Sequence, residues 1–129
     1  MEWLDSYSVG NSMLDDQNQK LLKLFDELEA CEKNGWSLGV AITALTWYAH
    51  HHFPLQEELL HDCGVADIED HLAAHRRFQA WLAECAAFRD IAGPGATLAA
   101  AAMLAFLRDW WQNHILVEDM KFKAVMVAR

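Results

Sequence analysis

Four segments of the chain place apolar residues at alternating steps of three and four, which is the spacing of one face of an α-helix. Turn-forming residues cluster between the segments, and no segment sustains the alternation of a β-strand. The apolar positions that define the four faces are Leu14, Leu21, Phe25 and Leu28; Leu38, Ile42, Leu45, Ala49 and Leu59; Ile68, Phe78, Leu82 and Cys85; and Ala100, Met103, Leu107 and Trp110. Four amphipathic helices with short connections predict an all-α fold, an up-down-up-down four-helix bundle.

Polar residues interrupt each of these inward faces at one level of the predicted bundle. The interrupting residues are Asn18, His52, Gln56, His71, His75 and His114. A buried polar group without a partner costs roughly 1–3 kcal/mol, so several of them in one core require compensation. Metal ions supply such compensation, and the facing helices of bundles commonly hold them. The pattern therefore predicts a metal site in the core.

The spacing of the polar residues indicates which of them reach one ion. His71 and His75 are four positions apart, which places both rings on one helix face. Two half-exposed histidines on a helix flank would show the same spacing, but their position on the inward face favours ligands. Asp119 follows His114 by five positions, about 140° further round an ideal helix. It is therefore either a ligand from the flank, a ligand brought round by altered winding, or an exposed carboxylate.

The run of three histidines at positions 50–52 cannot face inward as a whole, because successive helical residues turn by about 100°. His52 is on the inward face, and His50 and His51 are expected on the flanks. An E-x-x-H unit of the kind that ferritin-like bundles use occurs at Glu58 and His61, but neither residue is on an inward face. No nucleophile motif, substrate pocket or catalytic base is evident, so the chain is not expected to be an enzyme.

Length and charge narrow the class of protein. The 129 residues predict one domain, in which the first ten form an extended arm that packs on the bundle through Trp3 and Tyr7. The formal net charge of −9, without a basic stripe, argues against a nucleic-acid partner. No apolar run approaches the roughly 18 residues of a membrane span. The N-terminus lacks the form of a signal peptide, and the three cysteines show no C-x-x-C spacing, so a cytoplasmic protein is expected.

Several motifs together resemble those of one family. In order along the chain they are "VGNSMLDDQN", "LTWYAHHHF", "HLAAHRRF" and "WWQNHILVEDMKF". The chain resembles the hemerythrins, in particular the single-domain bacteriohemerythrins, over essentially residues 1–129. The resemblance implies a four-helix bundle with two non-haem irons. It implies that His71, His75 and His114 bind one iron, and that Asp119 bridges to a second iron, which His52 helps to hold.

Two positions depart from the family pattern. Asn18 stands where the family motif D-x-Q-H has a histidine ligand, and Gln56 stands where the motif H-F-x-x-E has a bridging glutamate. An amide offers one neutral oxygen, and its NH₂ group cannot coordinate a metal. We therefore expect one metal ion at the three-histidine side, either iron, zinc or manganese, and a second ion bound weakly or not at all.

Two further expectations concern the vacated half of the site. Asn18 and Gln56 can hydrogen-bond each other and His52 there. Alternatively, Pro54 removes a backbone hydrogen bond and can alter the winding, so that Glu57 turns inward as a replacement carboxylate.

The expected function is that of a hemerythrin-like non-haem iron protein that serves in oxygen or redox binding or sensing. Its expected partner is dioxygen or another small diatomic ligand, and no protein partner is predicted. Two alternatives stay open at this point. One is a non-haem iron enzyme, namely an oxidase, a peroxidase or a nitric oxide reductase. The other is a metal-free interaction module that keeps only the bundle.

Overall fold

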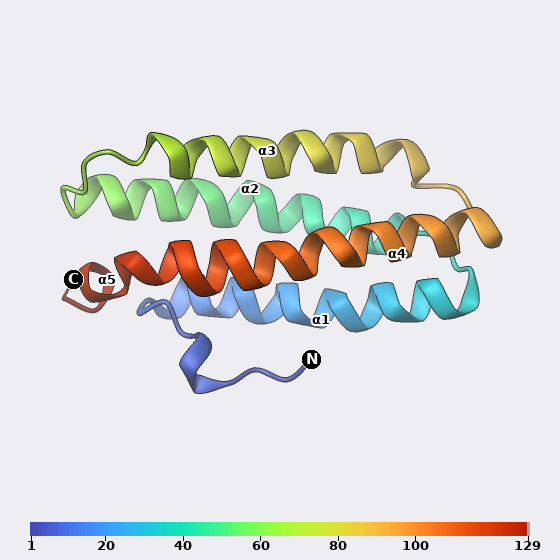
Figure 1. Cartoon of the computed structure of the whole chain (residues 1–129), viewed down its shortest axis with the longest axis horizontal. Helices are drawn as coiled ribbons and strands as arrows, with labels where there is room; N and C mark the ends of the chain where they lie inside the picture. Colours follow the sequence, from blue (N-terminus) through green and yellow to red (C-terminus); the bar gives the residue numbers. More distant parts are fainter. Residues whose placement is uncertain (129) are drawn as a thin grey trace.

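Four long helices run alternately up and down the molecule in the computed structural model, which describes residues 1–128 (Figure 1). They are α1 (Ser12–Asn34), α2 (Gly39–Asp62), α3 (Glu69–Cys85) and α4 (Pro94–Asp109). The fourth helix continues through a π-helix (Trp110–Glu118) and a 3₁₀ turn (Asp119–Phe122) into the short α5 (Lys123–Ala128). No strand occurs in the described part of the chain, and the predicted all-α, up-down-up-down bundle is confirmed.

Local caps define where the long helices begin and end. The side-chain oxygen of Asn11 accepts the N–H of Leu14 at 3.0 Å and caps the start of α1. Gly35 ends α1 in the left-handed conformation, with φ of 64°, which costs glycine little. Its carbonyl accepts the N–H of Gly93 at 2.8 Å, so the α1–α2 and α3–α4 loops are joined at this end. A Cβ atom at Gly35 would lie only 3.1 Å from Gly93, so this junction needs glycine.

Two clusters of buried apolar side chains fill the bundle, and the buried polar residues lie between them. Asn18 lies on α1 between Leu14, which belongs to the smaller cluster, and Leu21, which belongs to the larger one. Gln56 on α2 lies in the same way between the larger cluster and Leu60 of the smaller one. The apolar clusters therefore isolate the polar level from solvent at both ends.

The N-terminal arm packs on the bundle through aromatic rings, as predicted. Trp3 and Tyr7 meet the ring of Trp111 edge to face, at centroid distances of 6.4 and 5.3 Å. A 3₁₀ turn at Asp5–Tyr7 brings the arm against the helices, and Figure 1 shows the arm crossing beside α1.

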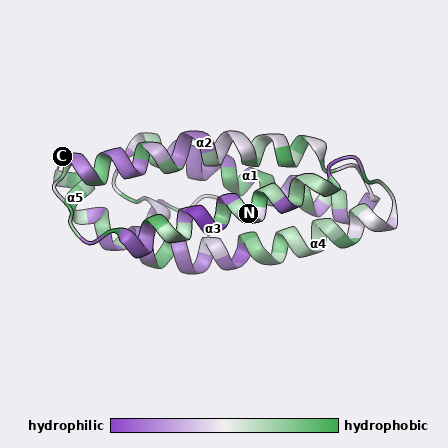
Figure 2. Ribbon diagram, turned by 90° about the horizontal axis from the view of Figure 1, so that it is seen from above, coloured by the Kyte–Doolittle hydropathy of each residue, from purple (hydrophilic) through white to green (hydrophobic). Residues whose placement is uncertain are grey.

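The four helices are not packed equally closely. The α1–α4, α1–α2 and α2–α3 pairs make the main backbone contacts, and α3 and α4 approach each other less. Figure 2 shows α4 as largely hydrophobic. Nevertheless, no helix within residues 1–128 combines the length and the apolar character that crossing a membrane requires.

Candidate metal centre

The π-helix brings Asp119 onto the same side as His114. The N–H of Asp119 donates to the carbonyl of His114, five residues earlier, which is the hydrogen bond of a π-helix. Residues five apart therefore return to nearly the same face, and the 140° offset of an ideal α-helix does not arise. Asp119 is 2% exposed, and its Oδ1 lies 3.2 Å from His114 Nε2. Of the three alternatives that spacing left open, the structure shows altered winding.

Three histidines converge next to this carboxylate. His71 and His75 come from α3 and His114 from the π-helix, and one ring nitrogen of each lies within 4.8 Å of the others. Asp119 Oδ1 is also 3.3 Å from His71 Nε2. Ligand atoms that share one ion lie about 2.0–2.2 Å from it, so these four atoms need only small shifts to surround a common centre. His50 and His51, by contrast, are exposed.

The chemistry of these buried atoms fits a metal ion. His75 Nε2, His114 Nε2 and Asp119 Oδ1 are buried and have no hydrogen-bond partner in the described structure. The 3.2 Å approach of His114 to Asp119 lacks hydrogen-bond geometry. Each unmet bond costs roughly 1–3 kcal/mol. Because a cation at their common centre would satisfy all three atoms at once, the residues present match what a metal ion requires.

The half of the core around His52 is organised by hydrogen bonds among neutral groups. His52 Nδ1–H donates to Gln17 Oε1 at 2.9 Å, and the Tyr48 hydroxyl donates to Asn18 Oδ1 at 2.8 Å. Gln56 Oε1 accepts from His71 Nε2 at 2.8 Å, a hydrogen bond that His71 would have to give up to bind a metal through this nitrogen. The expectation that Asn18 and Gln56 bond each other and His52 is therefore wrong. Each amide instead finds a partner on a neighbouring helix.

Tyr48 adds no negative charge to this half. Burial raises the pKa of its hydroxyl well above the ordinary value, and the charge of Asp119 raises it further. Tyr48 therefore stays protonated at neutral pH. Its ring stacks on His52 at 4.6 Å. Tyr48 precedes His52 by one helical turn, and that spacing could have indicated the contact from sequence.

Comparison with known proteins assigns the chain to one family. The family model described as "Hemerythrin HHE cation binding domain" matches residues 9–126. The chain belongs to the hemerythrin family. Its relatives include a "Hemerythrin-like protein" of Naegleria gruberi, 29% identical over 96% of this chain and 92% of that protein. They also include a "Bacteriohemerythrin" of Stenotrophomonas maltophilia, 25% identical over 93% of this chain and 77% of that protein. A "Myohemerythrin" of Riftia pachyptila is 26% identical over 94% of this chain and 89% of that protein. No solved structure matches.

Within this hemerythrin, Glu57 does not turn inward, so that expectation is also corrected. α2 stays helical through Pro54, which places Gln56 in the core at 1% exposure and leaves the Glu57 side chain 37% exposed on the flank. There Glu57 Oε2 accepts the Nδ1–H of His75 at 2.8 Å. Phe53 stacks on the same imidazole at 4.2 Å. A carboxylate on Nδ1 fixes the tautomer that points the Nε2 lone pair at a metal. Glu57 is therefore a partner of a candidate ligand, a role that the sequence reasoning missed.

The protonation states of His75 and Asp119 suit a cation. Burial, together with the neighbouring His71 and His114, lowers the pKa of His75 to about 2. Burial acts to raise the pKa of Asp119, but the close approach of His114 and His71 to its carboxylate outweighs it and holds this pKa well below the ordinary value. Neutral imidazoles and an ionised carboxylate are the forms that bind metals.

The Glu57 contact leads to a prediction about metal affinity. Glu57→Gln should weaken zinc binding by roughly 10–100-fold, because the neutral amide no longer fixes the tautomer of His75. A competition titration with a chromophoric chelator measures this affinity. The matched control is Glu58→Gln, the exposed neighbouring acid, which should leave the affinity unchanged. Equal losses in the two variants would show that general surface charge, rather than the contact with His75, is responsible.

The buried histidines also predict how the stability of the metal-free protein depends on pH. Burial lowers the pKa of His52 to about 4 and that of His75 to about 2, both from 6.5. Below pH 6.5 the unfolded chain binds protons that the folded chain does not, so the free energy of unfolding should fall as the pH falls. The loss is up to about 1.4 kcal/mol per histidine for each pH unit. Urea unfolding at pH 7.5 and 5.5 measures it, and equal stability at the two values would contradict the prediction.

Proposed function

We propose that this hemerythrin holds one metal ion, non-haem iron, at His71, His75, His114 and Asp119, and serves in oxygen or redox binding or sensing rather than as an enzyme. The observation that carries the proposal is the convergence of buried, unpartnered ligand atoms on one side of the core. The proposed external ligand is dioxygen or another small diatomic molecule. The cytoplasm is the proposed location.

The charge of the core supports one ion rather than two. Asp119 is the only carboxylate among the buried residues of positions 1–128. Asn18, Gln56 and protonated Tyr48 are neutral. One divalent cation beside Asp119 leaves one excess positive charge, and a second would leave three in a buried space. Because uncompensated buried charge is strongly unfavourable, the second ion has no adequate site.

The chain's own side chains shape the surroundings of the bound ion. Iron supplies open coordination positions and electrons for a small ligand. Trp110 stacks on His114 at 3.8 Å with the planes 14° apart, and Phe53 covers His75. These rings hold the imidazoles in place and limit the access of water. His52 keeps Nδ1 on Gln17, which leaves the Nε2 lone pair free to accept a hydrogen bond from a ligand bound nearby.

Metal counting tests the proposal directly. Full-length protein reconstituted with excess ferrous iron and then desalted should contain one iron per chain. The double variant Asn18→His, Gln56→Glu should contain two, because it restores an imidazole and a second buried carboxylate. His51→Ala is the control, since His51 is exposed and outside the site.

Three results of metal counting would go against the proposal. Two irons per wild-type chain would rule out the single-ion site. No iron at all would favour the metal-free interaction module. Loss of iron in His51→Ala would place the metal elsewhere on the chain.

A separate activity assay tests the enzyme alternative. Turnover of peroxide or nitric oxide by the iron-loaded protein would favour the enzyme.

A further inference from the structure

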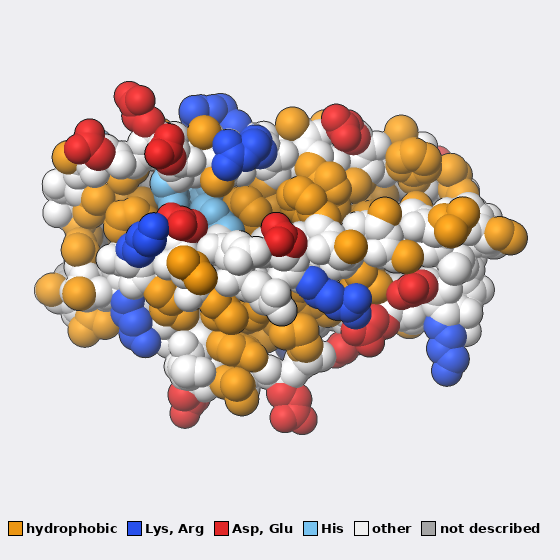
Figure 3. Space-filling model, in the orientation of Figure 1, with side chains coloured by type: hydrophobic (Ala, Val, Ile, Leu, Met, Phe, Trp, Pro, Cys, Tyr) orange, Lys and Arg blue, Asp and Glu red, His pale blue; other side chains and the backbone are white. Residues whose placement is uncertain are grey.

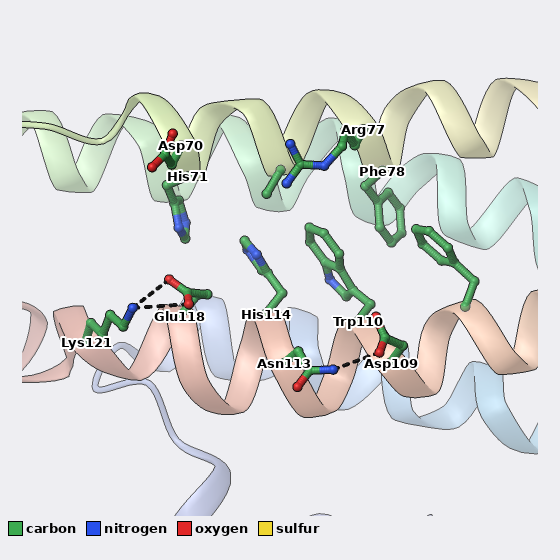
Figure 4. A pocket seen from close by; sticks show the side chains of 12 residues that line it. Asp70, His71, Arg77, Phe78, Asp109, Trp110, Asn113, His114, Glu118 and Lys121 are labelled. Atoms are coloured by element: carbon green, nitrogen blue, oxygen red, sulfur yellow. Dashed lines mark hydrogen bonds and ion pairs between the residues drawn. The ribbon is translucent and has the colours of Figure 1, made fainter.

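A cavity of about 610 Å³ opens between α3 and the fourth helix, which are not among the closely packed pairs of helices. Figure 3 shows histidine side chains at the bottom of a hollow in this face, with acidic and basic groups around its rim. His71 and His114 are among the residues that line the cavity. Figure 4 shows these two side chains projecting towards each other across it. The cavity thus reaches two of the candidate metal ligands from outside the core.

One wall of the cavity is aromatic. The ring of Trp110 lies 4.8 Å from that of Phe78, and the ring of Phe106 is nearly parallel to Trp110 at 6.5 Å. All three residues line the cavity. The half-buried Phe106 and the edge of Trp110 offer an apolar surface to the ring or alkyl chain of a small molecule, and the fully buried Phe78 packs against Trp110.

Two charges at the rim, on Glu118 and Lys121, are paired with each other, and a third, on Asp109, accepts a hydrogen bond. Asp109 accepts a hydrogen bond from Asn113 at 2.7 Å, and Lys121 donates to both oxygens of Glu118, at 2.9 and 3.1 Å. Within residues 1–128, no hydrogen bond or ion pair engages the side chain of Arg77. Figure 4 shows it extending along α3 in the direction of His71. An unpaired guanidinium beside an aromatic wall is therefore the distinctive polar feature of the cavity.

The remaining charges restrict which anion can enter. Asp70, Asp109 and Glu118 carry three negative charges at the lining, against two positive charges on Arg77 and Lys121. A multiply charged inorganic anion would be repelled there. A molecule with one carboxylate can meet Arg77 while its apolar part covers the rings, since guanidinium binds carboxylate through two parallel hydrogen bonds.

We propose that this cavity binds a small monocarboxylate with an apolar body, with Arg77 binding the carboxylate and Phe106 and Trp110 binding the apolar part. The volume lies within the range of small-molecule sites. The proposal rests on the cavity and is independent of the metal count. Because Trp110 also stacks on His114, a molecule bound here contacts the supports of the metal centre.

Benzoate is the probe, and it is titrated into the ¹⁵N-labelled full-length chain in metal-free and zinc-loaded forms. Saturable amide shifts along α3 and the π-helix are expected in both forms, with a dissociation constant of roughly millimolar size for so small a ligand. Benzamide, which has the same shape without the charge, should bind at least about ten-fold more weakly. Arg77→Gln should weaken benzoate by a similar factor.

The chain offers matched controls for this titration. Arg76→Gln removes the adjacent exposed arginine, which does not line the cavity, and should leave benzoate binding unchanged. Ala74→Leu adds volume inside the cavity without changing charge, and should weaken benzoate and benzamide alike.

Several results would overturn the proposal. Equal binding of benzamide and benzoate, equal losses in the two arginine variants, or shifts confined to another surface would each do so. Binding only in the zinc-loaded form would show that the carboxylate binds the metal rather than Arg77. Because the metal-free titration does not depend on iron content, failure of the single-ion proposal and failure of this one give different results.

Discussion

The constraint on which this structure depends is a buried carboxylate surrounded by imidazoles whose bonding capacity is unmet. The atoms His75 Nε2, His114 Nε2 and Asp119 Oδ1 are buried close to one another, and no group within residues 1–128 forms a hydrogen bond with them. These atoms destabilise the metal-free fold, at roughly 1–3 kcal/mol each. A cation removes that cost on binding. The same groups are therefore unfavourable for folding alone and favourable for holding a metal.

The rest of the bundle keeps these atoms together. Apolar clusters on both sides isolate the polar level, and α2 and α3 place their inward residues by ordinary helical spacing. The fourth helix places His114 and Asp119 inward by widening into a π-helix. In a regular α-helix, Asp119 would point away from His114. Glu57 on the flank and Phe53 within the core then hold His75 in place.

The sequence predicted the features that follow from regular helical periodicity. The four helices, the buried polar level and the pairing of His71 with His75 all follow from steps of three and four, because these steps place residues on one face. The position of Asp119 did not follow, because spacing rules assume about 3.6 residues per turn and nothing in the side-chain pattern signals a π-helix. The hydrogen-bond partners of Asn18 and Gln56 also did not follow from the sequence. Which group an amide bonds depends on the approach of a neighbouring helix, here through Tyr48 and His71.

Two neutral amides distinguish this site from the two-iron pattern of its family. Gln56 is turned towards the three-histidine half, and the oxygen of Asn18 is already bonded to Tyr48, so the half around His52 keeps a single imidazole. X-ray absorption spectroscopy of the iron-saturated protein tests this difference most directly. A spectrum with scattering from three imidazoles and no metal–metal contribution is predicted. A metal–metal contribution at roughly 3–4 Å would contradict the single-ion site.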